Sequence, residues 1–126
     1  MWSTGILNLG IVVNLFFKNI WGRARPGDIL QLGGRENFTP WFQISDACAN
    51  NCSFVSGDAA VGFSLIVFYF LTNKIVFFWL SLLFGFGIGL IRIMEGGHFV
   101  SDVVMAAVVL YLSYYFQMKY YINKYD

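Results

Sequence analysis

The sequence predicts an all-α transmembrane helix bundle, on its composition and on four long apolar stretches. Of the 126 residues, 58% are hydrophobic, 20% are aromatic and only 12% are charged, whereas soluble domains carry about 25% charged residues. A water-soluble fold of this size has no means of covering so much apolar surface, but a bilayer solvates it. The net charge of +1 argues against a nucleic-acid partner, because phosphate-backbone binders carry dense Lys and Arg clusters.

The four apolar stretches lie at roughly 5–21, 57–73, 75–91 and 99–117. Each is about 17–19 residues long, enough for a helix to cross a hydrocarbon layer of about 30 Å. The start of the chain lacks the basic segment of a secretory signal, so we expect the first stretch to remain as a span. Tight connections near 72–74 and 92–98 predict antiparallel neighbours in one domain over residues 1–126.

The one long polar segment, 22–56, is predicted to be a loop outside the hydrocarbon. Within it, the string PWFQISDACA at 40–49 predicts a short amphipathic helix at the membrane interface, with Trp41 and Phe42 toward lipid. Cys48 and Cys52 lie in this loop without the second Cys/His pair that a zinc site needs. We expect them to form a disulfide if the loop faces an oxidising compartment, and to be two free thiols otherwise.

The single histidine, His98, is followed four residues later by Asp102. On a helix this spacing stacks both side chains on one face. Asp102 would then accept a hydrogen bond from Nδ1–H and leave Nε2 bare, as a nucleophile or base requires. A purely structural histidine is the alternative, but ionisable groups that persist at a membrane boundary tend to be functional. The sequence therefore predicts His98 and Asp102 as a catalytic pair.

Three cations fall on the same side of the predicted bundle as His98: Lys18, Arg25 and Arg92. The second stretch begins at Ser56-Gly57, where free N–H groups at a helix start favour an anion. These groups together predict an anion site, and we expect no metal or other cofactor.

Three further charges near this site are ambiguous in the sequence. Arg23 and Arg35 either contact a lipid headgroup or a second phosphate, or are ordinary loop charges. Glu95 is either a second acid/base or a solvated turn residue, and the turn residue is favoured.

In order and spacing these residues resemble the three-part signature of the type-2 phosphatidic acid phosphatase superfamily. The matching strings are Lys18-xxxxxx-Arg25-Pro26, then Ser56-Gly57, then Arg92-xxxxx-His98-xxx-Asp102. The resemblance implies a phosphohistidine mechanism. His98 would attack phosphorus, Asp102 would stabilise the imidazolium, and the cations with the Ser56-Gly57 amides would hold the phosphate oxygens before water completes the reaction.

Asp58 departs from the family pattern, which has at this place a histidine that protonates the leaving group. We assign Asp58 the same catalytic role, although an aspartate is mostly ionised at neutral pH and is a weak acid catalyst. Asp58 could still fill this role if it is partly buried, or if the leaving group departs with little assistance from an acid. The string CSFVSGDA resembles the second motif of bacterial lipid A phosphatases of this superfamily, which favours lipid A as substrate over undecaprenyl diphosphate.

A second departure is length, because members of the family usually have six spans and the first motif follows the third. Here that motif follows the first stretch, so the first two family spans have no counterpart in the sequence. The chain is either a fragment or a minimal form whose bundle a homo-oligomer or partner spans would complete.

The charge distribution predicts the orientation. With the phosphate ligands set aside, the positive-inside rule places Lys74 and the C-terminal tail in the cytoplasm. We therefore expect a lipid phosphatase of the bacterial inner membrane, surrounded by membrane lipids, with its active site facing the periplasm. A lipid phosphotransferase with the same site, and a non-enzymatic membrane subunit that keeps a phosphate-binding face, are the alternatives.

Overall fold

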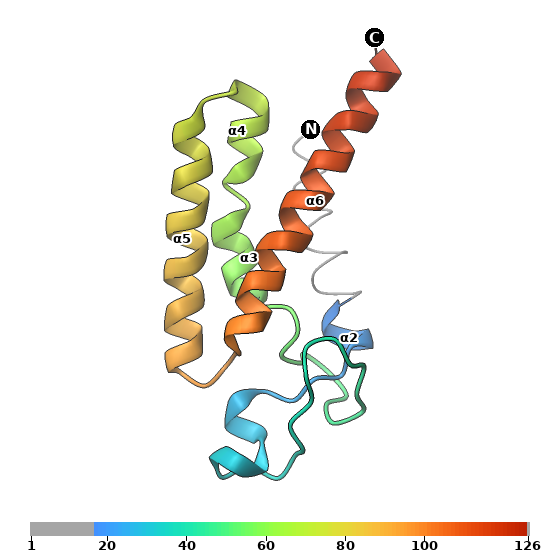
Figure 1. Ribbon diagram of the computed structural model, residues 1–126, viewed down its shortest axis with the longest axis vertical. Coiled ribbons are helices and arrows are strands. Elements are labelled where there is room, and N and C mark those ends of the chain that lie inside the picture. The colour runs from blue at the N-terminus through green and yellow to red at the C-terminus, as the bar shows by residue number, and fades with distance from the viewer. Residues whose placement is uncertain (1–16, 126) are drawn as a thin grey trace.

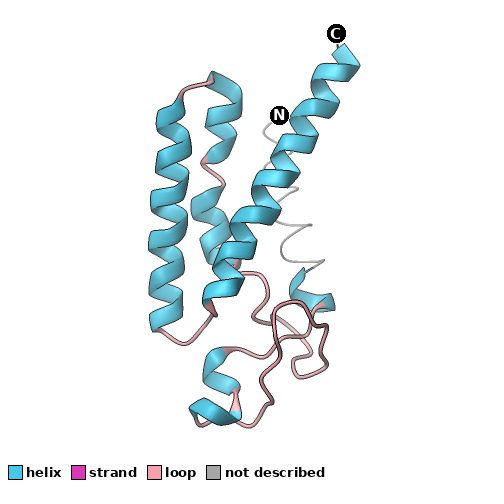
Figure 2. Cartoon of the chain, in the orientation of Figure 1, coloured by secondary structure: helices cyan, strands magenta, loops and turns pink. Residues whose placement is uncertain are grey.

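The computed structural model describes residues 17–125, which fold into helices joined by one long loop (Figure 1). A short α2 (Lys18–Ile20) leads into the loop, which contains two 3-10 turns, η2 (Pro26–Asp28) and η3 (Leu30–Leu32). The bundle follows as α3 (Gly57–Phe63), α4 (Ile66–Thr72), α5 (Ile75–Met94) and α6 (Val100–Tyr125). Between residues 17 and 125 there is no strand (Figure 2), so the predicted all-α class is confirmed.

In the described part of the chain, two helices are long and apolar enough to cross a membrane, α5 and α6. They match the predicted spans 75–91 and 99–117, although α6 continues to Tyr125. Large apolar side chains on α5, among them Trp79, Leu83 and Leu90, point outward. Such a surface is typical of a helix that faces lipid. The predicted span 5–21 lies outside the described residues, apart from 17–21.

The predicted span 57–73 is not one continuous helix, which corrects the sequence-based boundary. It divides into α3 and α4 at Ser64 and Leu65. The Phe63 carbonyl accepts a hydrogen bond from the Ser81 hydroxyl at 2.6 Å, and the Ser64 hydroxyl donates to the Val61 carbonyl at 2.6 Å. Because these hydroxyls compete for backbone carbonyls, the helix tightens locally and breaks.

Close contacts at three glycines hold α3 and α6 against α5. A Cβ atom on Gly62 would lie 2.7 Å from the Cα of Gly85, and one on Gly85 would lie 2.1 Å from the Phe63 ring. A Cβ atom on Gly89 would lie 2.3 Å from Val103 Cγ1. Small residues therefore permit the dense helix packing that a membrane bundle requires, since lipid supplies no hydrophobic force between helices.

The loop and the α5–α6 turn lie at one end of the bundle, while the α4–α5 turn and the C-terminus lie at the other (Figure 1). The Gly27 amide donates to the Gly96 carbonyl at 3.1 Å and so ties the loop to the α5–α6 turn. The predicted arrangement of the polar segments thus holds for the described residues, and it brings three separated motifs to one end.

The amphipathic helix predicted at 40–49 is absent. The segment instead runs in turns and bends along residues 21 and 22. The Ser45 amide donates to the Trp21 carbonyl at 2.9 Å, and the Cys48 amide donates to the Gly22 carbonyl at 3.0 Å. Because these amides are satisfied by a distant part of the chain, the segment gains nothing from local helix formation.

Candidate active site

His98 lies just before α6, and its ring is buried at the loop end of the bundle. Its Nδ1 atom is 2.8 Å from the Ser53 carbonyl oxygen. A carbonyl oxygen only accepts, so Nδ1 carries the proton and Nε2 of the neutral ring carries the lone pair. Nε2 is buried and has no hydrogen-bond partner among residues 17–125. This is the protonation pattern that a nucleophilic imidazole needs.

Asp102 does not accept the hydrogen bond predicted from His98, since its Oδ2 lies 3.8 Å from Nδ1. The prediction assumed a helix through both residues, but α6 begins at Val100. Oδ2 accepts instead from the Ser53 hydroxyl and, at 2.8 Å, from the Phe99 amide, where it caps the first turn of α6. Ser53 therefore joins the two predicted catalytic residues, with its carbonyl on His98 and its hydroxyl on Asp102.

Arg23 completes this buried cluster, a role that the sequence analysis missed. Its Nη1 atom is 2.5 Å from Asp102 Oδ1 and 2.8 Å from the Ser101 hydroxyl, and its Nε donates to the Thr39 carbonyl at 2.9 Å. The guanidinium lies 4.1 Å from the centroid of the Phe99 ring. The sequence shows only that Arg23 lies two residues before Arg25. That position does not predict that the Arg23 side chain is buried.

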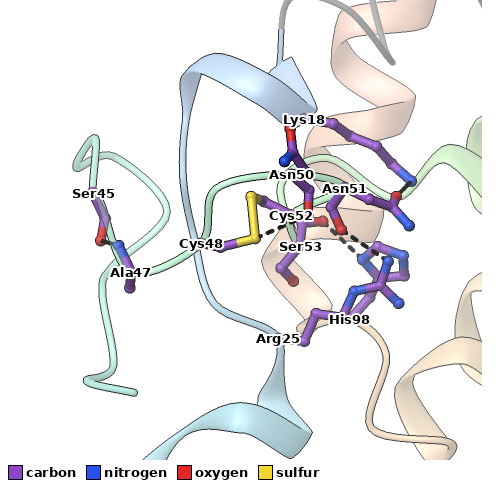
Figure 3. The surroundings of a disulfide bond; sticks show 10 residues. All are labelled: Lys18, Arg25, Ser45, Ala47, Cys48, Asn50, Asn51, Cys52, Ser53 and His98. Atoms are coloured by element: carbon purple, nitrogen blue, oxygen red, sulfur yellow. Dashed lines mark hydrogen bonds between the residues drawn. A yellow bond between two sulfur atoms is a disulfide. The ribbon is translucent and has the colours of Figure 1, made fainter. Parts of the chain in front are cut away.

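The predicted phosphate ligands Lys18 and Arg25 meet at the loop closed by Cys48 and Cys52 (Figure 3). Lys18 Nζ donates to the Asn51 side-chain oxygen at 3.1 Å, and Arg25 Nη2 donates to the Asn51 carbonyl at 3.0 Å. The two cysteines form a disulfide, as predicted for an oxidising compartment. Asn51 was not singled out in the sequence, because an exposed loop asparagine carries no chemical signal of its own.

Arg92 is paired with two carboxylates. Its Nε is 3.0 Å from Asp58 Oδ2, and its Nη1 is 2.6 Å from Glu95 Oε2. The side chain is partly exposed, and Lys18 lies within electrostatic range of both Arg92 and Asp58. The structure therefore brings the predicted acid, Asp58, next to a predicted phosphate ligand.

Ser56 supplies less to the predicted anion site than expected. It is the N-cap of α3, where its hydroxyl accepts from the Ala59 amide at 3.3 Å. Its own amide donates to the Asp102 carbonyl at 3.2 Å, so this N–H is already used within the protein. Gly57 opens α3 and is partly exposed. In residues 17–125, no group of three His, Cys, Asp or Glu side chains is placed to hold a metal ion.

The sequence model of the PAP2 superfamily matches residues 1–126. The chain belongs to this superfamily. A protein named lipid A 4'-phosphatase from Francisella tularensis subsp. novicida (strain U112) is 46% identical over 108 residues, covering 82% of this chain and 49% of that protein. A protein of the same name from Rhizobium leguminosarum is 33% identical, with 82% of this chain and 46% of that protein covered.

A third relative of that name, from Rhizobium etli (strain ATCC 51251 / DSM 11541 / JCM 21823 / NBRC 15573 / CFN 42), is 31% identical over 80% of this chain and 41% of its own. The chain thus spans less than half the length of each of these relatives. No solved structure matches the chain.

Membership of the PAP2 superfamily confirms the resemblance on which the site was predicted. In this member the three motifs do meet at one end of a membrane bundle, with Arg25, Asp58 and His98 each from a different motif. The second and third motifs are linked directly by the ion pair between Asp58 and Arg92. Ser53, Asn51 and Arg23 hold the motif side chains and were not predicted to do so.

Proposed function

We propose that this PAP2 chain forms the active site of a lipid phosphatase that removes phosphate from lipid A through a phosphohistidine intermediate. The observation that carries the proposal is the buried Nε2 of His98, which is unpartnered while Nδ1–H is held by the Ser53 carbonyl. The names of the relatives favour lipid A as the substrate. The outward apolar surface of α5 favours a substrate that reaches the site from the membrane.

In the first step, the lone pair of His98 Nε2 attacks phosphorus. An N–P bond forms, the bond from phosphorus to the lipid oxygen breaks, and the ring becomes a cation. The Ser53 carbonyl keeps its hydrogen bond to Nδ1–H, and the Asp102 carboxylate at 3.8 Å supplies negative charge beside the ring. Both favour the imidazolium over the neutral ring, so the transition state gains more than the ground state.

Lys18, Arg25 and Arg92 would hold the transferring phosphoryl group. Phosphoryl transfer depends mainly on positioning and on neutralising the oxygens in the transition state. Arg92 would exchange its carboxylate partners for the phosphate, because its present ion pairs are partly exposed and such pairs are weak.

Asp58 would act as the general acid of the first step, donating a proton from its carboxyl group to the departing lipid oxygen. In the second step it takes a proton from the water that attacks phosphorus, the N–P bond breaks, and inorganic phosphate leaves His98 in its starting form.

The proposed location is the bacterial inner membrane, with the loop end of the bundle in the periplasm. The disulfide between Cys48 and Cys52 supports this orientation, because disulfides persist in oxidising compartments such as the periplasm. The active site would then act on lipid A in the outer half of the membrane.

The test is release of inorganic phosphate from lipid A by the purified full chain in detergent, compared with His98→Ala. Loss of the nucleophile should lower the rate by on the order of 10⁴-fold or more. Brief acid-free quenching with radiolabelled substrate should trap acid-labile phosphate on the wild type and none on the variant. Lys74→Ala, at the far end of the bundle, is the matched control and should keep full activity.

Undecaprenyl diphosphate serves as the competing substrate in the same assay. Faster phosphate release from it than from lipid A would overturn the substrate assignment. A wild-type chain that binds lipid A and releases no phosphate from either lipid would overturn the phosphatase itself.

A further inference from the structure

We propose that Asn51 is a positioning residue that holds Lys18 and Arg25 together as one phosphate-binding unit before substrate arrives. The proposal rests on the proposed phosphatase function and adds a residue that lies outside the family motifs. It is carried by the two hydrogen bonds of Asn51 and by the anchoring of the short loop that contains it.

Both oxygen atoms of Asn51 are used, one on each cation. The side-chain oxygen accepts from Lys18 Nζ at 3.1 Å, and the main-chain carbonyl accepts from Arg25 Nη2 at 3.0 Å (Figure 3). Lys has three N–H donors and Arg has five. Each cation therefore gives one donor to Asn51 and keeps the others for phosphate oxygens.

A bridging residue is needed because the two cations repel each other. Lys18 is partly buried and has Arg25 and Arg92 as nearby like charges. Long basic side chains also lose considerable rotamer freedom when they are held in one place. The amide and carbonyl dipoles of Asn51 offset part of this cost and are already in place when substrate binds. A carboxylate at this position would attract the cations more strongly, but it would compete with the phosphate for them.

The backbone of Asn51 is suited to this bridge. Its φ of 51° is in the left-handed region, which asparagine adopts more readily than most residues. In this conformation Asn51 presents its carbonyl to Arg25 and its side chain to Lys18.

The loop that carries Asn51 is anchored on both sides. Its ends are joined by the Cys48–Cys52 disulfide. The Cys48 amide donates to the Gly22 carbonyl at 3.0 Å, and the Ser53 amide donates to the Arg23 carbonyl at 2.8 Å. These bonds fix the loop to the segment that bears Lys18 and Arg25. Because the Ser53 carbonyl holds His98, the same loop sets the position of the cations relative to the nucleophile.

The deciding variant is Asn51→Gly, which removes the side-chain oxygen while keeping the carbonyl and permitting the positive φ. The matched control is Asn73→Gly, since Asn73 has a φ of 53° and lies in the α4–α5 turn at the opposite end of the bundle. The first measurement is the affinity of the full chain for inorganic phosphate by calorimetry. The second is KM and kcat for lipid A.

We expect Asn51→Gly to weaken phosphate binding about tenfold, as loss of one hydrogen bond to a charged group predicts, and to raise KM for lipid A by a similar factor. The melting temperature should match that of Asn73→Gly. Asn51→Asp keeps both acceptors and should also weaken phosphate binding, because the added carboxylate competes for the cations. Phosphate affinity and KM equal to those of Asn73→Gly in the Asn51→Gly chain would overturn the proposal.

The two readouts separate this proposal from the proposed function. Phosphate binding needs no turnover. A wild-type chain that binds phosphate, loses that binding on Asn51→Gly and hydrolyses no lipid would support the role of Asn51 and reject the phosphatase. If the wild-type chain hydrolyses lipid A and Asn51→Gly has the same KM, the phosphatase is supported and the role of Asn51 is rejected.

Discussion

Two sets of ion pairs lie at the same end of the bundle and differ in their access to solvent. Arg23 and Asp102 have side-chain exposures of 3% and 0%. Arg92 is 32% exposed, and its partners Asp58 and Glu95 are 53% and 55% exposed. The buried pair is closed in by the Phe99 ring and further hydrogen bonds, whereas the side chains of the Arg92 pairs are partly exposed.

The difference separates structural charges from charges that can bind substrate. Breaking a buried pair leaves an uncompensated ion in a medium that solvates it poorly, so Arg23 has no freedom to leave Asp102. Breaking an exposed pair costs little, because water takes the place of the lost partner. The proposed exchange of Asp58 and Glu95 for phosphate at Arg92 should therefore cost little, whereas Arg23 stays paired with Asp102 beside His98.

The largest effect is expected for Arg23→Leu. This variant leaves Asp102 charged and unpaired inside the protein, and it should lower the free energy of unfolding by about 3–5 kcal/mol and abolish phosphate release. Arg35→Leu, on the exposed part of the same loop, is the control. Thermal unfolding in detergent gives the melting temperature of each of the two variants. Equal melting temperatures for Arg23→Leu and Arg35→Leu would contradict the structural role of Arg23.

The double variant Arg23→Leu/Asp102→Leu sharpens this test. Removing both charges should recover part of the stability lost in Arg23→Leu, because no isolated ion remains buried. Activity should stay absent, since the charge beside the imidazolium is gone. Relative to Arg23→Leu, the double variant should therefore have a higher melting temperature and the same lack of phosphate release.

Arg92→Ala should affect catalysis and spare the fold. Loss of one cation that stabilises the transition state should lower kcat/KM by about 10²–10³, or roughly 2.7–4 kcal/mol. The free energy of unfolding should change by less than about 1 kcal/mol, because the ion pairs lost are exposed. A fall in stability as large as that of Arg23→Leu would remove the distinction between the two regions.

Ser53→Ala should have an intermediate effect. The variant removes the hydroxyl that donates to Asp102 but keeps the carbonyl that holds His98. One acceptor position of a buried carboxylate is left unsatisfied, at a cost of about 1–3 kcal/mol in stability. Ser113→Ala on α6, whose hydroxyl donates to a carbonyl one turn back, is the control. A chain as stable as this control would show that Asp102 does not depend on Ser53.

The smallest effect is expected for Glu95→Gln. Arg92 loses one competing partner, so phosphate affinity should rise, by no more than about fivefold. The increase should shrink as salt is added, since exposed pairs are screened. Glu36→Gln in the loop controls for net charge. Weaker phosphate binding in Glu95→Gln would mean that Glu95 positions Arg92 and does not compete for it.

Much of the architecture was predictable from the sequence. The apolar stretches at 75–91 and 99–117 gave the positions of α5 and α6 to within a few residues at most ends, because a long uncharged run in this composition has one low-energy state in a bilayer. Of the two states that the sequence left open for Cys48 and Cys52, the structure shows the disulfide. The motif residues from Lys18 to Asp102 predicted the superfamily that the comparisons show.

The errors share one cause, which is competition from distant parts of the chain. The break at Ser64 depends on the Ser81 hydroxyl, seventeen positions away in the sequence. The 40–49 segment is held out of a helix by the carbonyls of residues 21 and 22. Local sequence patterns contain no information about such distant partners. They therefore predicted a continuous helix at 57–73 and an amphipathic helix at 40–49.

The sequence by itself determined that lipid is the solvent of this chain, and it predicted that Lys18, Arg25, Asp58, Arg92 and His98 belong to one site. Composition and motif order can be read from the sequence without a structure. Only the tertiary structure decided how these groups are held. Burial and hydrogen-bond partnership depend on contacts across the chain, and they assigned Asp102 to Arg23, His98 to Ser53, and Lys18 with Arg25 to Asn51.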